Sequence, residues 1–283
     1  MRELTIYQLW FTNADCYKSG VRQTQRGVQV HSTGANNPWL HRYVQPDDGR
    51  LGKNKYGNHS NKAGSNVCAS AYIGKLENGK AAVYQVLPWD MRCWLSGSGN
   101  AGNANRLGYI GFEVCEDGLT DRAYFNEVVL GLAVNLCAYL CQLMGQQPDT
   151  VLGRYNGHDR YTVSDHAELH AAGVGSGHAD ISHWLKKFGF SMNDFRGMVR
   201  SAMMEGVRVT YIDALNGTKG DDDVNANKVI WSKNNGYVNV RDNPNGTSLA
   251  MLRPGSKCEA DETKGEWTHV VIDGWVKNEF LKG

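Results

Sequence analysis

The sequence predicts an α/β fold with a mixed β-sheet flanked by helices, followed by a small all-β barrel. Strand-like apolar runs alternate with helical patterns in residues 1 to about 203, which is typical of a sheet covered by helices. Residues 216–227 are rich in Gly, Asp and Asn, as loops are. After them come only short strand-like runs separated by turn residues, which is typical of a small barrel.

Length and composition suit one medium-sized domain plus a small one. Of the 283 residues, 41% are hydrophobic and 21% are charged, so the chain can bury a sizeable core. The net charge of +1 argues against a general nucleic-acid binder, which usually has a marked basic excess. No stretch approaches the roughly 18 to 20 apolar residues that span a bilayer, and no secretory signal is evident. We therefore expect a protein that is made in the cytoplasm and does not insert into membranes.

Four apolar runs in the first part are predicted to be strands: residues 27–30, 67–74, 81–87 and 109–115. The second and third runs are joined across Asn78-Gly79, and Asn-Gly between apolar runs is a strong hairpin signal. The run 27–30 leads directly into His31. The run 109–115 has the apolar character of a buried central strand.

Two helices are predicted from signals at their ends. Thr120 or Asp121 can cap a long helix whose apolar residues recur at helical spacing, and Gly145 ends it. Ser191 and Asp194 resemble a capping box that opens a last helix, which reaches about residue 203.

The seven cysteines are an odd number and include no Cys-x-x-Cys pair: Cys16, Cys68, Cys93, Cys115, Cys137, Cys141 and Cys258. We expect reduced core thiols rather than a disulfide framework, and no zinc site built from cysteines.

The second part is predicted to hold short strands at residues 236–241, 248–252, 267–272 and 274–276. The segment 207–212 could be an extra strand of the same barrel. We therefore expect a first domain at residues 1–205, a linker or first barrel strand at 206–228, and a barrel at 229–283.

Histidines gather near the end of the first part. Of nine histidines, four fall between residues 166 and 183, together with acidic residues that include Asp180. A hydrolytic zinc site needs three protein ligands and one position open to water. His31, at a strand end, suits a ligand or a structural cap equally well, whereas His166 and Asp180 flank a Gly-rich loop that could let them converge. His158 and His170 remain alternatives to His166.

Two further residues have the chemistry of a catalytic site. Glu113 lies inside an apolar run, where an unpaired carboxylate is costly, and partial burial would raise its pKa toward the range of a general base. His178 and Asp180 are two residues apart, so in extended chain their side chains point the same way. One could bind a metal while the other faces the substrate.

Several segments resemble the N-acetylmuramoyl-L-alanine amidase family of the amidase-2 type, which includes phage endolysins, bacterial autolysins and peptidoglycan recognition proteins. The matching segments are Val28-Gln29-Val30-His31-Ser32-Thr33-Gly34-Ala35-Asn36-Asn37-Pro38, Leu87-Pro88-Trp89-Asp90-Met91-Arg92, residues 110–117 and residues 166–184. They are most similar to endolysins from phages and prophages of Gram-positive gut bacteria. The resemblance implies the fold of this family and zinc as the cofactor.

The resemblance also implies roles for single residues. It makes His31, His166 and Asp180 the zinc ligands and Glu113 the base. It places His178 where the family more often has a lysine that stabilises the developing oxyanion.

The substrate cleft departs from the family pattern. Where many relatives have Trp-His-Ala-Gly, this chain has Trp94-Leu95-Ser96-Gly97, so a substrate contact is altered. Trp39 and Trp94 could offer flat surfaces to sugar or peptide, although ordinary packing explains each of them about as well.

The C-terminal part resembles a bacterial SH3-like domain, on the segments Gly236-Tyr237-Val238-Asn239-Val240-Arg241, Pro254-Gly255, Trp267-Thr268-His269-Val270 and Gly274-Trp275-Val276. By this resemblance, Tyr237 and Trp275 could line a groove that binds wall peptides. Packing in the barrel core would explain the presence of Trp275 at least as well.

Together the resemblances imply an endolysin that hydrolyses the amide bond between N-acetylmuramic acid and L-alanine in bacterial peptidoglycan. We expect it to reach the wall after release from the cytoplasm. Two alternatives stay open: a non-catalytic peptidoglycan receptor of the same fold, and a peptidase that cuts within the stem peptide. The oligomeric state is not indicated by the sequence.

Overall fold

The computed structural model describes residues 1–216 and, beyond them, residue 245 and five strands. The chain divides into two compact units, Met1–Lys219 and Gly220–Gly283. The strands of the first unit are β1 (Arg2–Gln8), β2 (Gly27–Ser32), β3 (Ala71–Lys75), β4 (Ala81–Gln85), β5 (Tyr109–Val114), β6 (Val151–Tyr155), β7 (His158–Tyr161), β8 (Val163–Asp165) and β9 (Val207–Asp213). Its helices are α1 (Asp15–Lys18), η1 (Leu40–Arg42), η2 (Ala104–Leu107), α2 (Arg122–Phe125), η3 (Asn126–Ala133), α3 (Val134–Met144), α4 (His166–Ala171), α5 (Ser182–Lys187) and α6 (Met192–Glu205).

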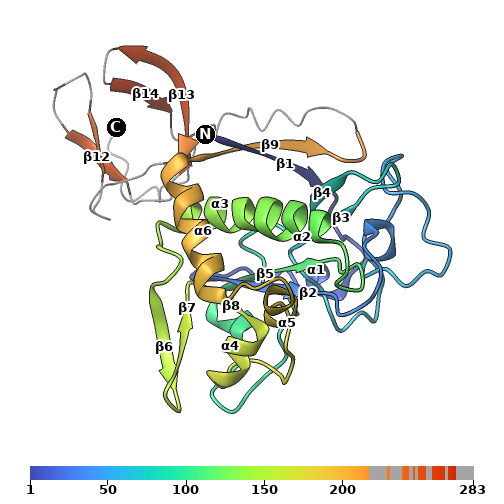
Figure 1. The fold of residues 1–283 in the computed structure, drawn as a ribbon. Helices are drawn as coiled ribbons and strands as arrows, with labels where there is room; N and C mark the ends of the chain where they lie inside the picture. Colours follow the sequence, from blue (N-terminus) through green and yellow to red (C-terminus); the bar gives the residue numbers. More distant parts are fainter. Residues whose placement is uncertain are drawn as a thin grey trace. The chain divides into compact units, whose positions relative to one another are not determined.

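The first unit is built on a seven-stranded sheet in the order β8-β2-β5-β3-β4-β1-β9. The strands β8, β2, β5 and β3 run parallel, β3 and β4 are antiparallel, and β4, β1 and β9 are again parallel. The antiparallel pair is the hairpin predicted across Asn78-Gly79. The predicted mixed sheet flanked by helices is confirmed (Figure 1).

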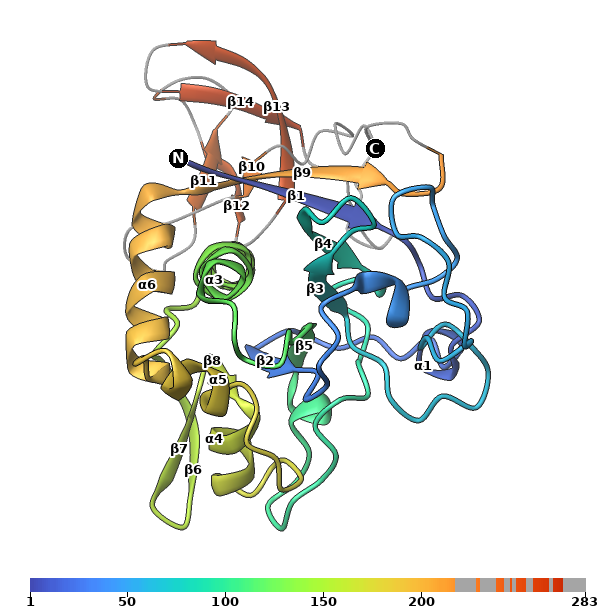
Figure 2. The ribbon, with the colours of Figure 1, turned by 45° about the vertical axis from the view of Figure 1, so that its right-hand side comes forward.

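Alternate residues of the strands pack on opposite faces of this sheet. On β2, Val28 and Val30 join a core with α3 and α6, while Gln29 and His31 therefore point to the opposite face. On β3, Tyr72 belongs to a second core with the loops around α1. Figure 2 shows α3 and α6 on one side of the sheet and α1 on the other.

The predicted end signals of the two helices are confirmed. Asp121 accepts hydrogen bonds from two backbone N–H groups of the first turn, and Gly145 ends α3 in the left-handed region at φ 64°. Ser191 and Asp194 form a capping box at the start of α6, which ends at Glu205.

The segments α2, η3 and α3 form one apolar helical stretch, Arg122–Met144, that is long enough to cross a membrane by length and composition. This differs from the expectation that no stretch approaches such a length. Half of its most apolar window is buried within the protein, and its side chains pack on the sheet, as expected of a core helix. A membrane-spanning helix and the core helix of a folded domain can have the same length and composition, and here the packing on the sheet identifies a core helix.

The segment 207–213 is not a barrel strand. As β9 it pairs in parallel with β1 along seven residue pairs, from Arg2 opposite Val207 to Gln8 opposite Asp213, and so forms an edge of the large sheet. Its strand-like pattern was recognised correctly, but the pattern does not specify a partner. The first unit consequently extends past residue 205.

The prediction that no cysteine is paired is wrong for one pair. Cys16 and Cys68, which lie 52 residues apart, form a disulfide that joins α1 to the segment before β3. Cys93, Cys115, Cys137 and Cys141 are free and buried, as expected. A pairing over this separation depends on how the two loops pack, and spacing does not reveal it.

A hairpin that was not predicted follows α3. Strands β6 and β7 are antiparallel and turn at Asn156-Gly157, both with positive φ, 47° and 82°. The hairpin lies beside α4 (Figure 1).

The described strands of the second unit are β10 (Lys228–Val229), β11 (Val238–Arg241), β12 (Ser248–Leu252), β13 (Lys257–Lys264) and β14 (Trp267–Val271). They form a three-stranded sheet, β10-β13-β14, and a two-stranded sheet, β11-β12, both antiparallel. Three of the four predicted strands overlap β11, β12 and β14. The fourth, at 274–276, lies outside the described residues.

Candidate metal centre

Strand register brings three polar residues to one level of the sheet. His31 on β2 is paired directly with Glu113 on β5. On its other side, β2 pairs with β8 as far as Val30 opposite Asp165, and His166 follows Asp165 directly. Residues from three distant parts of the sequence are therefore neighbours at the carboxyl ends of parallel strands.

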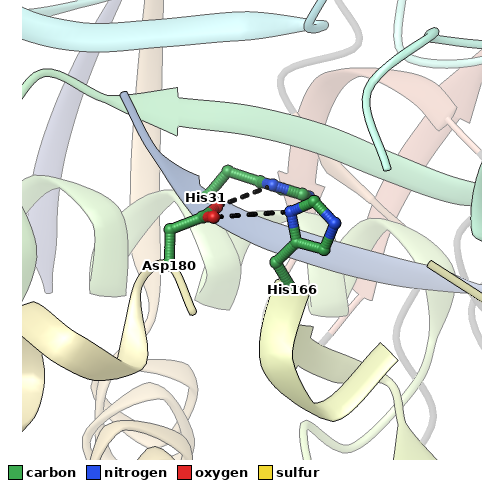
Figure 3. A group of neighbouring side chains, drawn as sticks. All are labelled: His31, His166 and Asp180. Carbon is green, nitrogen blue, oxygen red and sulfur yellow. Dashed lines mark ion pairs between the residues drawn. The ribbon is translucent and has the colours of Figure 1, made fainter. Parts of the chain in front are cut away.

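Asp180 completes this group from the segment before α5. Its Oδ2 lies 3.0 Å from Nδ1 of His31, and its Oδ1 lies 3.4 Å from Nδ1 of His166 (Figure 3). The backbone N–H of His166 donates to the Asp180 carbonyl at 2.9 Å, which ties the two segments together. His31 and His166 are only 1% and 4% exposed.

The three side chains fit a zinc ion. One ligand atom from each lies within 4.8 Å of the others. In a tetrahedral zinc site with bonds of about 2.0–2.1 Å, ligand atoms are roughly 3.3 Å apart, and the two nitrogen–oxygen distances here are 3.0 and 3.4 Å. Two imidazoles and one carboxylate leave a fourth position for water, as in hydrolytic zinc sites.

The charge states of the group suit metal binding. Burial lowers the pKa of His31, against the opposing effect of its hydrogen bond to Asp180, so the imidazole is neutral at neutral pH. Burial acts to raise the pKa of Asp180, but the hydrogen bonds to His166 and His31 outweigh it and hold that pKa well below its usual range. Neutral imidazole and ionised carboxylate are the forms that bind metal.

Glu113 stands beside His31 with an unused oxygen. Its Oε2 is buried and has no hydrogen-bond partner within the described part of the chain. Burial raises the pKa of Glu113 well above its ordinary value, and the charges of Asp180 and Glu116 raise it further. A carboxyl group of this kind can accept a proton near neutral pH.

His178 lies at the exposed rim of the group. Its ring centre is 4.7 Å from that of His166, and its Nδ1 is 3.2 Å from the hydroxyl of Ser176. It is therefore near the three clustered side chains and also open to solvent, where a substrate would arrive.

Glu116 lies just past the end of β5, where nothing in the sequence marks it out. It is 4% exposed, accepts a hydrogen bond from the Ser32 hydroxyl and lies 3.0 Å from Nε2 of His183. The hydrogen bond to Glu116 raises the pKa of His183. Because His183 follows shortly after Asp180, this pair holds the Asp180 segment against the ends of β2 and β5.

The alternative histidines lie outside the group. His158 is exposed on β7 and pairs with Tyr155. The ring Nδ1 of His170 is 3.2 Å from the Gly175 carbonyl. Neither belongs to the three-residue group that the described residues form.

The predicted aromatic surfaces have different surroundings. Trp39 stacks on His41, with ring centres 6.1 Å apart, and both line a cavity of about 680 Å³ together with the exposed Tyr56. Trp94 instead packs against the second core, which favours the packing interpretation. Two further aromatic candidates, Tyr237 and Trp275, lie outside the described residues.

A family model described as N-acetylmuramoyl-L-alanine amidase matches residues 22–180, more than half of the chain. No curated protein matches the sequence. Among solved structures, the hydrolase AmiA of Staphylococcus aureus, crystallised in complex with its ligand, has a TM-score of 0.48 and 20% identity over 72% of this chain and 85% of its own. The catalytic domain of XlyA has a TM-score of 0.41 and 19% identity over 69% of this chain and 98% of its own.

Proposed function

Because this chain belongs to the N-acetylmuramoyl-L-alanine amidase family, we propose that it is a zinc-dependent enzyme that hydrolyses the amide between N-acetylmuramic acid and L-alanine in peptidoglycan. One observation carries the proposal. The Nδ1 atoms of His31 and His166 both face the carboxylate of Asp180, at 3.0 and 3.4 Å, and Glu113 stands at the same level of the sheet.

His31, His166 and Asp180 would hold the metal. When bound there, zinc supplies Lewis acidity, which acidifies water and polarises the scissile carbonyl. Glu113 takes one proton from the attacking water through its unpartnered Oε2. The oxygen adds to the carbonyl carbon, the C–N bond breaks, and the departing amine of L-alanine receives the proton from Glu113.

His178 is proposed to donate a hydrogen bond to the carbonyl oxygen as negative charge builds on it. Its exposure and its position beside His166 support this role. The departure of this position from the lysine that is more common in the family leaves the chemistry intact, since both side chains can donate.

The cavity at Trp39 is proposed to hold a part of the wall polymer next to the scissile bond. Its rim includes Asn37, whose backbone N–H donates to the Glu116 carbonyl at 2.8 Å, so the cavity adjoins the end of β5. A volume of about 680 Å³ is in the range of small-molecule sites. Flat rings beside amide side chains suit sugar or peptide.

We propose further that the second unit is an SH3-like wall-binding domain and that the whole protein is an endolysin released onto the wall. The resemblance of residues 236–276 to bacterial SH3-like domains supports the first part, and the antiparallel strands of this unit are compatible with it. A tethered binder raises the effective concentration of the catalytic unit at its substrate.

Digestion of purified peptidoglycan by the zinc-loaded protein tests the proposal. Mass spectrometry should detect intact stem peptides with a free L-alanine amino end and glycan that keeps its lactyl carboxyl group. Cleavage between two amino acids of the stem would indicate a peptidase. Binding without any cleavage, by a protein shown to contain zinc, would indicate a receptor; the complete group of His31, His166, Asp180 and Glu113 supports the enzyme.

A further inference from the structure

A buried polar network lies behind His31. Its Nε2 is 3.2 Å from Oε1 of Gln29, a residue that is fully buried two positions earlier on β2. The side-chain amide of Gln29 donates from Nε2 to Oδ1 of Asn105 at 2.8 Å, and this bond sets which way the amide faces. The carbonyl oxygen of Gln29 can only accept, so the neutral ring that binds zinc carries its hydrogen on Nε2 and offers the Nδ1 lone pair to the metal in place of the hydrogen bond to Asp180.

A second set of hydrogen bonds does the same for His166. The Oγ of Ser176 lies 3.1 Å from the Ser96 carbonyl, 3.2 Å from Nε2 of His166 and 3.2 Å from Nδ1 of His178. A serine hydroxyl has one hydrogen and two lone pairs, and a backbone carbonyl can only accept. The hydroxyl therefore donates to the Ser96 carbonyl, and His166 donates from Nε2 to this hydroxyl. The neutral ring that binds zinc then again offers its Nδ1 lone pair to the metal.

The two sets meet at one buried residue, Ser96. Its hydroxyl donates to Oε1 of Gln29, and its backbone carbonyl accepts both the N–H of Ser176, at 2.8 Å, and the Ser176 hydroxyl. The neighbouring Gly97 makes this approach possible. It has a φ of +66°, and an added Cβ would lie 2.9 Å from Oγ of Ser176.

We propose that Ser96 is a positioning residue that sets the tautomer and ring orientation of both histidine ligands, through Gln29 for His31 and through Ser176 for His166. The inference rests on the zinc site of the proposed function. Hydrogen bonds of this kind orient metal-binding histidines, and their loss typically weakens metal affinity about 10-fold to 100-fold.

Zinc affinity of the full-length protein, measured by competition with a chromophoric chelator, tests the proposal without reference to catalysis. Ser96→Ala removes only the hydroxyl and should weaken zinc binding about 10-fold through His31. Ser176→Ala should weaken it by a similar factor through His166, and the two losses should multiply in the double variant, because they act on different ligands. Ser98→Ala, in the same loop but exposed, is the matched control and should bind zinc like the wild type.

A double-mutant cycle of Ser96 and Gln29 tests whether Ser96 acts on His31 through Gln29. Adding Ser96→Ala to Gln29→Leu should weaken zinc binding no further, because the Ser96 hydroxyl acts on His31 only through Gln29. The visible spectrum of the cobalt-substituted protein should change in Ser96→Ala and stay unchanged in Ser98→Ala.

Two results would overturn the inference. One is wild-type zinc affinity in Ser96→Ala; a lower melting temperature of the zinc-free variant would then show that the hydroxyl is purely structural. The other is full additivity of Ser96→Ala and Gln29→Leu. Failure of the wild-type protein to bind zinc would instead remove the proposed function itself, so the two failures are distinguishable.

Discussion

Replacing Glu113 with glutamine should abolish most activity and change stability in a pH-dependent way. Loss of a general base typically costs about 10²-fold to 10⁴-fold in kcat, or roughly 2.7 to 5.5 kcal/mol. Zinc content should remain, since Glu113 is not among the three clustered ligands. Activity on purified wall and metal analysis of the same sample are the assay.

The stability effect follows from the raised pKa of Glu113. Because the folded-state pKa lies above the unfolded value of about 4.3, the folded protein holds a proton that the unfolded chain has lost, and stability falls as pH rises from that value to the raised pKa. Each unit of the shift corresponds to about 1.4 kcal/mol, or roughly 3–6 °C in melting temperature for a unit of about 200 residues.

The glutamine variant lacks this loss. Relative to the wild type, the zinc-free Glu113→Gln protein should therefore gain stability between pH 4 and pH 8. Any pH-independent cost of burying the amide cancels when the stability difference between variant and wild type is compared at different pH values. Thermal unfolding of both proteins in the presence of a chelator measures this difference. A constant difference across this range would refute the electrostatic reasoning, and substantial remaining activity would remove Glu113 from the role of base.

Four other changes have defined outcomes. Asp180→Ala and His31→Ala should each lose zinc and wall lysis while keeping the fold, which metal analysis and circular dichroism would check; a zinc-loaded Asp180→Ala protein would contradict the ligand assignment. His183→Ala should lower the free energy of unfolding by about 1 kcal/mol or less, because His183 is about one-third exposed. Since pairing with Glu116 raises the pKa of His183, this loss should be largest below about pH 6.5 and should fade as pH rises through the raised pKa. An equal loss at pH 5.5 and pH 9 would exclude the ion pair as its cause. Removing Gly220–Gly283 should leave a folded amidase that binds wall more weakly. Thermal unfolding checks the fold, and co-sedimentation with purified wall checks the binding. Loss of folding would show that the two units depend on each other.

Elements with local signals could be predicted from the sequence alone. The Asn78-Gly79 hairpin, the Asp121 cap and the capping box of Ser191 and Asp194 all appear as expected. Each depends on residues within a few positions of one another, so the sequence contains the whole interaction.

Pairing between distant segments could not be predicted in this way. The strand pattern of 207–213 was recognised, but its placement beside β1 required the packed sheet. The disulfide between Cys16 and Cys68 likewise depends on where two loops meet. In both cases many partners are compatible with the local pattern, and burial in the folded unit selects one.

The candidate site shows the same division. Residue chemistry and a family resemblance indicated His31, His166, Asp180 and Glu113, but only the folded chain shows that His166 lies beside Asp180 while His158 and His170 lie outside this group.

The network behind these ligands could not be read from the sequence at all. Gln29 and His31 lie two positions apart on one face of β2, which the sequence does indicate. The hydrogen bonds of Gln29 to Asn105 and Ser96, however, join segments about 70 to 80 residues apart, and so does the bond between Ser96 and Ser176. Directional hydrogen bonds need atoms within about 3 Å and in the right orientation, and only the folded chain provides that.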